Sequence, residues 1–381
     1  MAMDRLFLLM KEKGASDMFL TVNSAIHMKI DGTLIPINQQ KMDPAYIMSL
    51  LAEVVPAGKL QELERDNELN MGIPVSGVGS FRLSAFRQRN SISAVLRYIP
   101  YIIPEMATLN MPPILSELIV AKRGLMLVVG ATGSGKSTTI ASMLDYRNQM
   151  MAGHILTLED PIEFLFRNKK SIVNQREVGV DTQGLSIALR NALRQAPDCI
   201  LIGEIRDRET MAAAMAYAQS GHLVVSTMHA SNSYRALNRI IGFFPIENRP
   251  ALLQDLASTL TAIVSQRLLP SIDGGRVPAV EILLNTRHIS ELIEQGEISQ
   301  VKEAIEKSLS PGSQTFEQAL MQLIRDGKVT QEEALANADS ASNLFWLINN
   351  SNSTKTGKTP HPEPVKDVPE GATFTEFTLN T

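Results

Sequence analysis

The stretch that decides the fold reads GLMLVVGATGSGKST and spans residues 124–138. Residues 125–129 form an apolar run of strand length, and residues 138–148 continue with a sequence that favours a helix. Between them, residues 130–137 fit the spacing GxxxxGK(S/T) of a phosphate-binding loop, which joins a strand to a helix. A glycine-rich turn that arose by chance would not need a strand before it and a helix after it. The stretch therefore predicts an α/β fold with a nucleotide-binding loop.

The residue types in this loop suit a polyphosphate. Its glycines allow successive backbone N–H groups to point at phosphate oxygens, which side chains would obstruct. We expect Lys136 to reach the β- and γ-phosphates, the Ser137 hydroxyl to bind Mg²⁺, and the start of the following helix to favour the anion. ATP and Mg²⁺ are therefore the predicted cofactors. The residues of this stretch expected to bind the nucleotide are Gly130, Ala131, Thr132, Gly133, Ser134, Gly135, Lys136, Ser137 and Thr138.

Composition and charge limit the class of protein. The 381 residues are 44% hydrophobic and 20% charged, with a formal net charge of -4, which suits two globular domains and does not favour a nucleic-acid partner. The single cysteine, Cys199, excludes an intramolecular disulfide framework and suits a reducing compartment. No apolar stretch reaches the ~18 residues that a membrane span needs. We expect a cytoplasmic protein that meets a membrane only through its partners, without direct insertion.

Residues 1–99 combine helical periodicity with alternating strand patterns, which predicts a small α+β domain. The expected helices span residues 4–13, 43–55 and 57–67, and the expected strands span residues 25–30 and 80–87. Residues 100–113 contain four prolines and are predicted to form an extended linker between two domains.

Residues 114–350 alternate strands and helices, which is typical of a mostly parallel sheet covered on both faces. The apolar runs predicted as its buried strands are residues 125–129, 155–158, 199–202 and 223–227. Residues 273–275 (Asp-Gly-Gly) predict a hairpin at the edge of the sheet, and residues 288–339 predict a set of helices. Residues 351–381 are predicted to be a disordered tail, either solvated throughout or with residues 374–379 as a docking strand for a partner.

Polar side chains follow each predicted strand. Glu159 and Glu163 follow the second strand, Glu204 the third and His229 the fourth. Because the carboxyl ends of parallel strands meet at one edge of a sheet, we expect a single site there. Glu163 is the candidate for orienting the attacking water, with Glu159 in support. Glu204 could hold Mg²⁺ through water or share the base role, and His229 could sense the γ-phosphate. The alternative is that these groups only cap the next element.

Arginines provide the remaining candidates, because hydrolysis at such a loop is usually completed by a cation from outside it. Arg190 and Arg194 lie four residues apart on one expected helix face, and Arg206 follows the third strand. Arg82 and Arg97 lie in the N-terminal domain. All of them could be ordinary surface charges. Arginines that complete a site would most naturally act across a subunit boundary, which implies a ring.

Four segments together carry a family resemblance: the phosphate-binding loop at residues 130–137, an "Asp box" at 159–163, an atypical Walker B run ending in Gly203-Glu204, and a "His box" at 222–229. Over residues 1 to about 345 the chain resembles the secretion-type ATPases of type II secretion and type IV pilus motors. Because paired CxxC motifs are absent, it is most similar to the pilus-retraction branch, PilT and PilU. Residues 288–293 (HISELI) and the chain beyond Asn350 place it closer to PilU.

The resemblance implies a PAS-like domain at residues 1–99, a linker at 100–113, and a RecA-like ATPase domain with C-terminal helices at 114–350. It also implies a hexameric ring that binds ATP between subunits. Such a ring would disassemble the pilus at an inner-membrane platform protein, in concert with a PilT-like motor. By position, Glu163 matches the proposed catalytic glutamate of the family, Glu204 its Walker B glutamate, and Arg82 and Arg97 arginines that approach nucleotide.

Two alternatives stay open at this stage. One is an ATPase that drives pilus extension or type II secretion. The other is an ATP-binding regulatory ring subunit with little turnover of its own.

Overall fold

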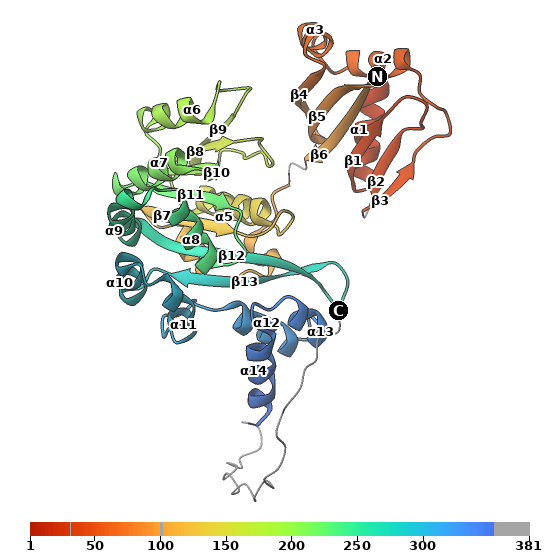
Figure 1. The fold of residues 1–381 in the computed structure, drawn as a ribbon. Coiled ribbons are helices and arrows are strands. Elements are labelled where there is room, and N and C mark those ends of the chain that lie inside the picture. Colours follow the sequence, from red (N-terminus) through yellow and green to blue (C-terminus); the bar gives the residue numbers. More distant parts are fainter. Residues whose placement is uncertain (31, 100–101, 354–381) are drawn as a thin grey trace, which may run out of the picture.

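The computed structural model describes residues 1–30, 32–99 and 102–353, with side chains as far as residue 350. Figure 1 shows two units, an N-terminal unit (residues 1–99) and a larger central unit that continues to the C-terminal helices. Residues 351–353 of the predicted tail are helical, and residues 354–381, with the possible docking strand at residues 374–379, lie outside the described residues.

The N-terminal unit is an antiparallel sheet covered by helices. Its strands lie in the order β3-β2-β1-β6-β5-β4. Its core includes Phe7 and Phe81, which stack with ring centroids 4.0 Å apart. The predicted α+β pattern is confirmed, with helix and strand ends shifted by a few residues. The bounds are α1 (Ala2–Glu12), β1 (Ala15–Leu20), β2 (His27–Ile30), β3 (Thr33–Pro36), α2 (Pro44–Ala52), α3 (Ala57–Asp66), β4 (Glu68–Val75), β5 (Gly79–Gln88) and β6 (Ser91–Ile99).

A seven-stranded sheet in the order β13-β12-β7-β11-β10-β8-β9 forms the centre of the larger unit. The strands are β7 (Gly124–Val129), β8 (Gly153–Glu159), β9 (Ser171–Glu177), β10 (Cys199–Glu204), β11 (Leu223–Met228), β12 (Leu260–Pro270) and β13 (Arg276–Leu284). All neighbours are parallel except β12 and β13, which form the predicted hairpin at the edge. The α/β prediction with a mostly parallel sheet is therefore confirmed.

The four predicted strands are the contiguous inner strands β8, β10, β11 and β7, and every residue of β7 is buried. The remaining parallel edge strand, β9, was not predicted. Its sequence SIVNQRE is half polar, and only Ser171 is fully buried. An edge strand with one covered side does not need the continuous apolar run by which buried parallel strands are recognised.

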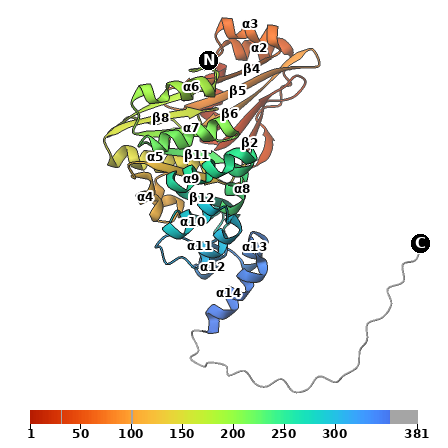
Figure 2. The ribbon, with the colours of Figure 1, turned by 60° about the vertical axis from the view of Figure 1, so that its left-hand side comes forward.

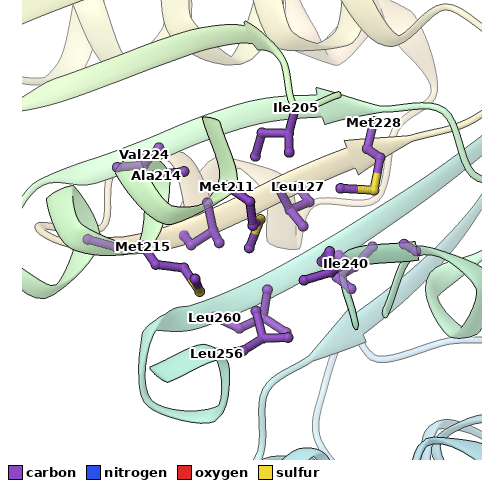
Figure 3. Close-up of a cluster of buried hydrophobic side chains, with 14 of the residues drawn as sticks. Leu127, Ile205, Met211, Ala214, Met215, Val224, Met228, Ile240, Leu256 and Leu260 are labelled. Carbon is purple, nitrogen blue, oxygen red and sulfur yellow. The ribbon is translucent and has the colours of Figure 1, made fainter. Parts of the chain in front are cut away.

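Helices cover both faces of this sheet. Figure 3 shows Met211, Ala214 and Met215 of α7 close to strand residues such as Leu127, within one buried cluster. The opposite face is packed by α4 and α5, through residues such as Leu115 and Met143. The helices up to the hairpin are α4 (Ile114–Ile119), α5 (Lys136–Met150), α6 (Leu185–Ala192), α7 (Arg208–Gln219), α8 (Ser233–Gly242) and α9 (Arg249–Thr259).

The segment between the two units corrects one expectation. Residues 106–109 form the 3-10 helix η1 (Met106–Leu109), so the predicted linker is not extended throughout. Met106 and Met111 pack against the core of the central unit, and the Ser142 hydroxyl donates to the Pro104 carbonyl at 2.5 Å. The prolines restrict the backbone here, but these apolar side chains hold the segment on the sheet unit.

The predicted C-terminal set is helical and continues beyond residue 339. Its helices are α10 (Arg287–Gln295), α11 (Val301–Glu306), α12 (Phe316–Arg325), α13 (Gln331–Ala336) and α14 (Ala341–Ser353). In Figures 1 and 2 the N-terminal unit and α14 lie at opposite ends of the molecule. Among the described residues, no helix combines the length and apolar character required to cross a membrane.

Candidate functional site

A cavity of about 810 Å³ opens at the carboxyl ends of β7, β8, β10 and β11. The four strand ends that were expected to form one site therefore do meet. Arg82 and Arg97 of the N-terminal unit also line it. The predicted residues on its wall are Arg82, Arg97, Thr132, Gly133, Gly135, Lys136, Ser137, Thr138, Glu159, Glu163, Glu204, Arg206 and His229.

The phosphate-binding loop follows β7, and its last two residues, Lys136 and Ser137, are the first two of α5. Gly133 and Gly135 have φ angles of 79° and 89°, in the left-handed region that favours glycine. A Cβ on Gly130 would lie 2.4 Å from Ser134 Oγ and 2.6 Å from the Gln266 carbonyl oxygen, so only glycine fits there. The sequence therefore uses glycine where the turn and the close approach of β12 require it.

The loop provides the donors that a polyphosphate needs. Lys136 Nζ donates to the carbonyls of Gly130 and Ala131 at 3.0 and 2.8 Å. Burial lowers the pKa of Lys136, and the charges of Glu204 and Glu163 act in the opposite direction. The Ser134 hydroxyl is buried without a hydrogen-bond partner among the described residues. These groups fit an anion held over the loop.

The two carboxylates at the end of β8, those of Glu159 and Glu163, lie in different environments. Glu159 is 9% exposed and accepts from Thr157 Oγ1 at 2.6 Å and Gln175 Nε2 at 3.1 Å. It also accepts from the Glu163 backbone, and burial raises the pKa of Glu159 to about 7. Glu163 itself is exposed on the cavity wall. The Glu159 carboxyl is thus held by hydrogen bonds in a buried position, whereas the Glu163 carboxylate is exposed and can contact water.

The third and fourth strand ends are joined by Glu204. Its Oε2 accepts from Arg206 Nε at 2.7 Å, and its Oε1 lies 3.3 Å from His229 Nε2. The bond and charge of Glu204 raise the pKa of Arg206. A Cβ on Gly203 would lie 3.1 Å from the Leu158 carbonyl oxygen, so glycine allows β10 to approach the end of β8. This contact gives a packing reason for glycine where Walker B usually has aspartate.

Arg82 and Arg97 are direct cross-strand partners on β5 and β6. Two like charges opposite each other repel, and an anion in the cavity would offset that repulsion. Arg97 Nε is also 2.8 Å from Oδ1 of Asp17, a carboxylate with 8% exposure. Both arginines line the cavity formed by the phosphate-binding loop of their own chain.

Two predicted arginines lie elsewhere, and Gly130, Ala131 and Ser134 of the loop are also not on the cavity wall. Arg190 belongs to α6 and Arg194 to the 3-10 helix η2 (Leu193–Gln195), and neither lines this cavity. Their catalytic role stays a prediction that requires another subunit. His222 precedes β11 at its opposite end, where its Nδ1 lies 3.1 Å from the Tyr217 carbonyl oxygen. That position gives His222 a local structural contact.

Sequence reasoning missed the contribution of β12. Leu268 lines the cavity, and Gln266 Oε1 accepts from Thr139 Oγ1 at 2.8 Å. These residues follow the phosphate-binding loop by more than a hundred positions and belong to no motif. Asp207 also lines the cavity, and its carboxylate caps α7 by accepting from the Thr210 backbone at 2.8 Å. The polar run after β10 could have indicated Asp207, but nothing in the sequence indicated Gln266.

The comparisons with known proteins concern the chain as a whole. A family model described as "Type II/IV secretion system protein" matches residues 3–336. The type IV pilus ATPase PilU of Pseudomonas aeruginosa is 45% identical over 349 residues, covering 91% of each chain. The pilus retraction ATPase PilT of the same organism is 39% identical, covering 87% of this chain and 97% of that protein.

A solved structure gives the same result for the fold. The pilus retraction motor PilT with bound ADP has a TM-score of 0.84 and 41% identity to this chain, covering 90% of this chain and 99% of that one. A match over most of the chain by the family model, by two curated relatives and by a solved structure shows the family. The chain belongs to the type II/IV secretion system protein family, and within it is similar to PilU and PilT.

Proposed function

We propose that this chain is the ATP-hydrolysing subunit of a motor that retracts type IV pilus fibres and so drives twitching motility. One observation carries the proposal. The phosphate-binding loop, Glu163, Glu204 and His229 line a single cavity, in a chain similar over most of its length to a type IV pilus ATPase and a pilus retraction ATPase. The fold alone would not support a reaction, because the same fold hosts different functions.

The residues that line the cavity have separate roles in the proposed hydrolysis. Lys136 and the backbone N–H groups of the loop bind the β- and γ-phosphates, and Arg82 and Arg97 add charge from the opposite wall. Glu163 orients the water that forms a bond to the γ-phosphorus as the bond to the bridging oxygen breaks, giving ADP, phosphate and a proton. His229, held by Glu204, faces the same space.

Mg²⁺ would be held by the Ser137 hydroxyl and, through water, by Glu204. When bound, it neutralises charge on the phosphate oxygens. The described residues contain no cluster of three or more His, Cys, Asp or Glu side chains suited to a metal ion. A magnesium ion in such a loop takes most of its ligands from the phosphates and water, so no all-protein cluster is required.

The assembly in which this occurs belongs to the same proposal. Six copies would form a ring, which would act at the cytoplasmic side of the inner membrane on a pilus platform protein. A role beside a PilT-like motor, which the resemblance to PilU implies, is part of the same proposal. Arg190 and Arg194, which do not face the cavity of their own chain, are candidates for contacts with a neighbouring subunit.

The test replaces Glu163 by Gln, which keeps the side-chain size and removes the carboxylate. ATP turnover of the purified protein, alone and mixed with a PilT-like motor, is expected to fall about 100-fold or more. Glu247→Gln, at an exposed carboxylate, serves as the control. Cells whose only copy carries Glu163→Gln are expected to extend pili that persist under load.

Each alternative has its own outcome. Cells without pili would mean an extension motor, so the direction proposed here would be wrong. Turnover that is absent in the wild type alone and appears only with the partner motor would identify a regulatory ring subunit. Full turnover by the Glu163→Gln variant would overturn the assignment of Glu163.

A further inference from the structure

Strand β12 contacts the phosphate-binding loop through alternate residues. Gln266 accepts from Thr139, and a Cβ on Gly135 would lie 2.8 Å from Gln266 Nε2. Leu268, two residues further along, lines the cavity. Because side chains alternate along a strand, Ser265 and Arg267 point to the other face of the sheet.

On that other face, β12 and β13 hold the loop of residues 229–233. Arg267 Nη2 donates to the Ser231 carbonyl at 3.1 Å. Glu281, 2% exposed on β13, accepts from the Ser233 backbone N–H at 2.8 Å and from Ser265 Oγ at 3.0 Å. The loop begins with His229, which contacts Glu204 in the cavity. Its position relative to the cavity therefore depends on contacts made from β12 and β13.

The same guanidinium reaches the C-terminal helices. Arg267 forms an ion pair with Asp339 and donates to the Asn337 carbonyl, both in the connection between α13 and α14. Its central carbon lies 3.9 Å from the ring centroid of Phe316 on α12. Asp339 also accepts from Asn232 Nδ2 at 2.7 Å. Loop 229–233 and helices α12–α14 thus meet at one side chain.

This junction is largely shielded from water. The side chains of Arg267 and Asp339 are 20% and 14% exposed. Removing one partner of such a pair leaves the other poorly solvated, so the junction is held as a unit. Among the described residues, none of the hydrogen-bond, ion-pair or aromatic partners of the Arg267 side chain lines the cavity. Its influence on the cavity must therefore pass through the loop that it holds.

We propose that Arg267 is a positioning residue that fixes the His229 loop to helices α12–α14, so that ATP turnover depends on the docking of these helices. The inference rests on the proposed ATPase activity. A nucleoside triphosphate, whose γ-phosphate would face His229, should in turn change the docking of α12–α14, because coupling between two binding sites is reciprocal. ADP lacks that phosphate and should not be coupled to the docking. The C-terminal helices thereby acquire a role in hydrolysis although they lie outside the cavity.

The first test separates turnover from binding in the full chain. Arg267→Met is expected to lower kcat about ten-fold while the Kd of a fluorescent ADP analogue stays within about two-fold. Arg276→Met, at an exposed position on the same hairpin, should change neither. If Arg267→Met unfolds the protein, Arg267→Lys keeps the charge but not the fork of donors, and an intermediate kcat is expected. An unchanged kcat in the variant that folds would overturn the proposal.

The second test does not need turnover. Hydrogen exchange of residues 337–348 is measured with and without a non-hydrolysable ATP analogue. We expect the analogue to change exchange in the wild type and in Arg276→Met, but not in Arg267→Met. The same nucleotide response in all three proteins would overturn the coupling. If the wild type binds the analogue but hydrolyses no ATP, the proposed function fails while this measurement still decides the role of Arg267.

Discussion

At the scale of single residues, the two carboxylates of the Asp box differ by environment and not by type. Glu163 reaches the cavity surface, whereas Glu159 is buried and surrounded by donors from Thr157, Gln175 and the turn itself. The sequence predicted both as catalytic because each follows the same strand. It favoured Glu163 over Glu159, but it could not show that Glu159 is buried, since that burial depends on β9, which supplies Gln175 and has no distinctive pattern.

The raised pKa of Glu159 makes a prediction for stability. In the folded protein burial raises the pKa of this carboxyl to about 7, whereas the ordinary pKa of a glutamate is 4.5. The unfolded chain releases that proton first, so the stabilisation is complete below pH 4.5 and is lost as the pH rises through about 7. The difference corresponds to about 3 kcal/mol.

Glu159→Gln cannot ionise, and its amide can replace the protonated carboxyl. The melting temperature of the wild type should therefore fall relative to that of Glu159→Gln as the pH is raised from about 5 to about 8. Glu332→Gln, at an exposed carboxylate, should follow the wild type throughout. Parallel melting curves for wild type and Glu159→Gln across this range would show that Glu159 is ionised in the folded protein.

At the scale of elements, the close approach of β10 and β8 is what brings Glu204 beside the Asp box. Predicting both strands was straightforward, because each is a continuous apolar run between polar segments. The short distance between the two strand ends could not be predicted, because the tight contact at Gly203 is visible only in the structure. A Cβ there would lie 3.1 Å from the Leu158 carbonyl and 3.4 Å from Glu159 Cα, both of them backbone atoms that cannot rotate away.

Gly203→Ala is therefore expected to lower the free energy of unfolding by about 1–3 kcal/mol, as in other overpacked cores. Gly72→Ala provides the matched control, because it is also a strand glycine but has no atom within 4 Å of the added Cβ. That change should be neutral or slightly stabilising. Denaturant unfolding of the two variants compares them directly, and equal stability would mean that the β8 end yields to the methyl group.

At the scale of the whole molecule, the cavity combines parts that no single segment predicts. The strand ends could be assigned to one site because parallel strands share an edge. Gln266 and Arg267 were out of reach, since their contacts arise only when β12 joins β7 far along the chain. The arginines of the N-terminal unit were found, but whether they serve their own chain or a neighbour stayed open in the sequence.

In the single chain Arg82 and Arg97 line the cavity of their own phosphate-binding loop, which favours a role within their own chain. Arg82→Gln is expected to lower turnover by weakening charge stabilisation of the phosphates, whereas Arg89→Gln, in the exposed turn of the same unit, should not. Rings assembled from two impaired variants then distinguish an arginine that serves its own chain from one that serves a neighbouring chain.

Subunits carrying Arg82→Gln are assembled with subunits carrying Lys136→Ala, and ATP turnover of the mixture is measured. If Arg82 serves its own chain, every cavity lacks one of the two cations and the mixture stays as inactive as its components. If Arg82 acted across a boundary, some cavities would receive Lys136 from one subunit and Arg82 from the next, and turnover would return. We expect no recovery, because the two cations that close on the nucleotide come from the two units of one chain.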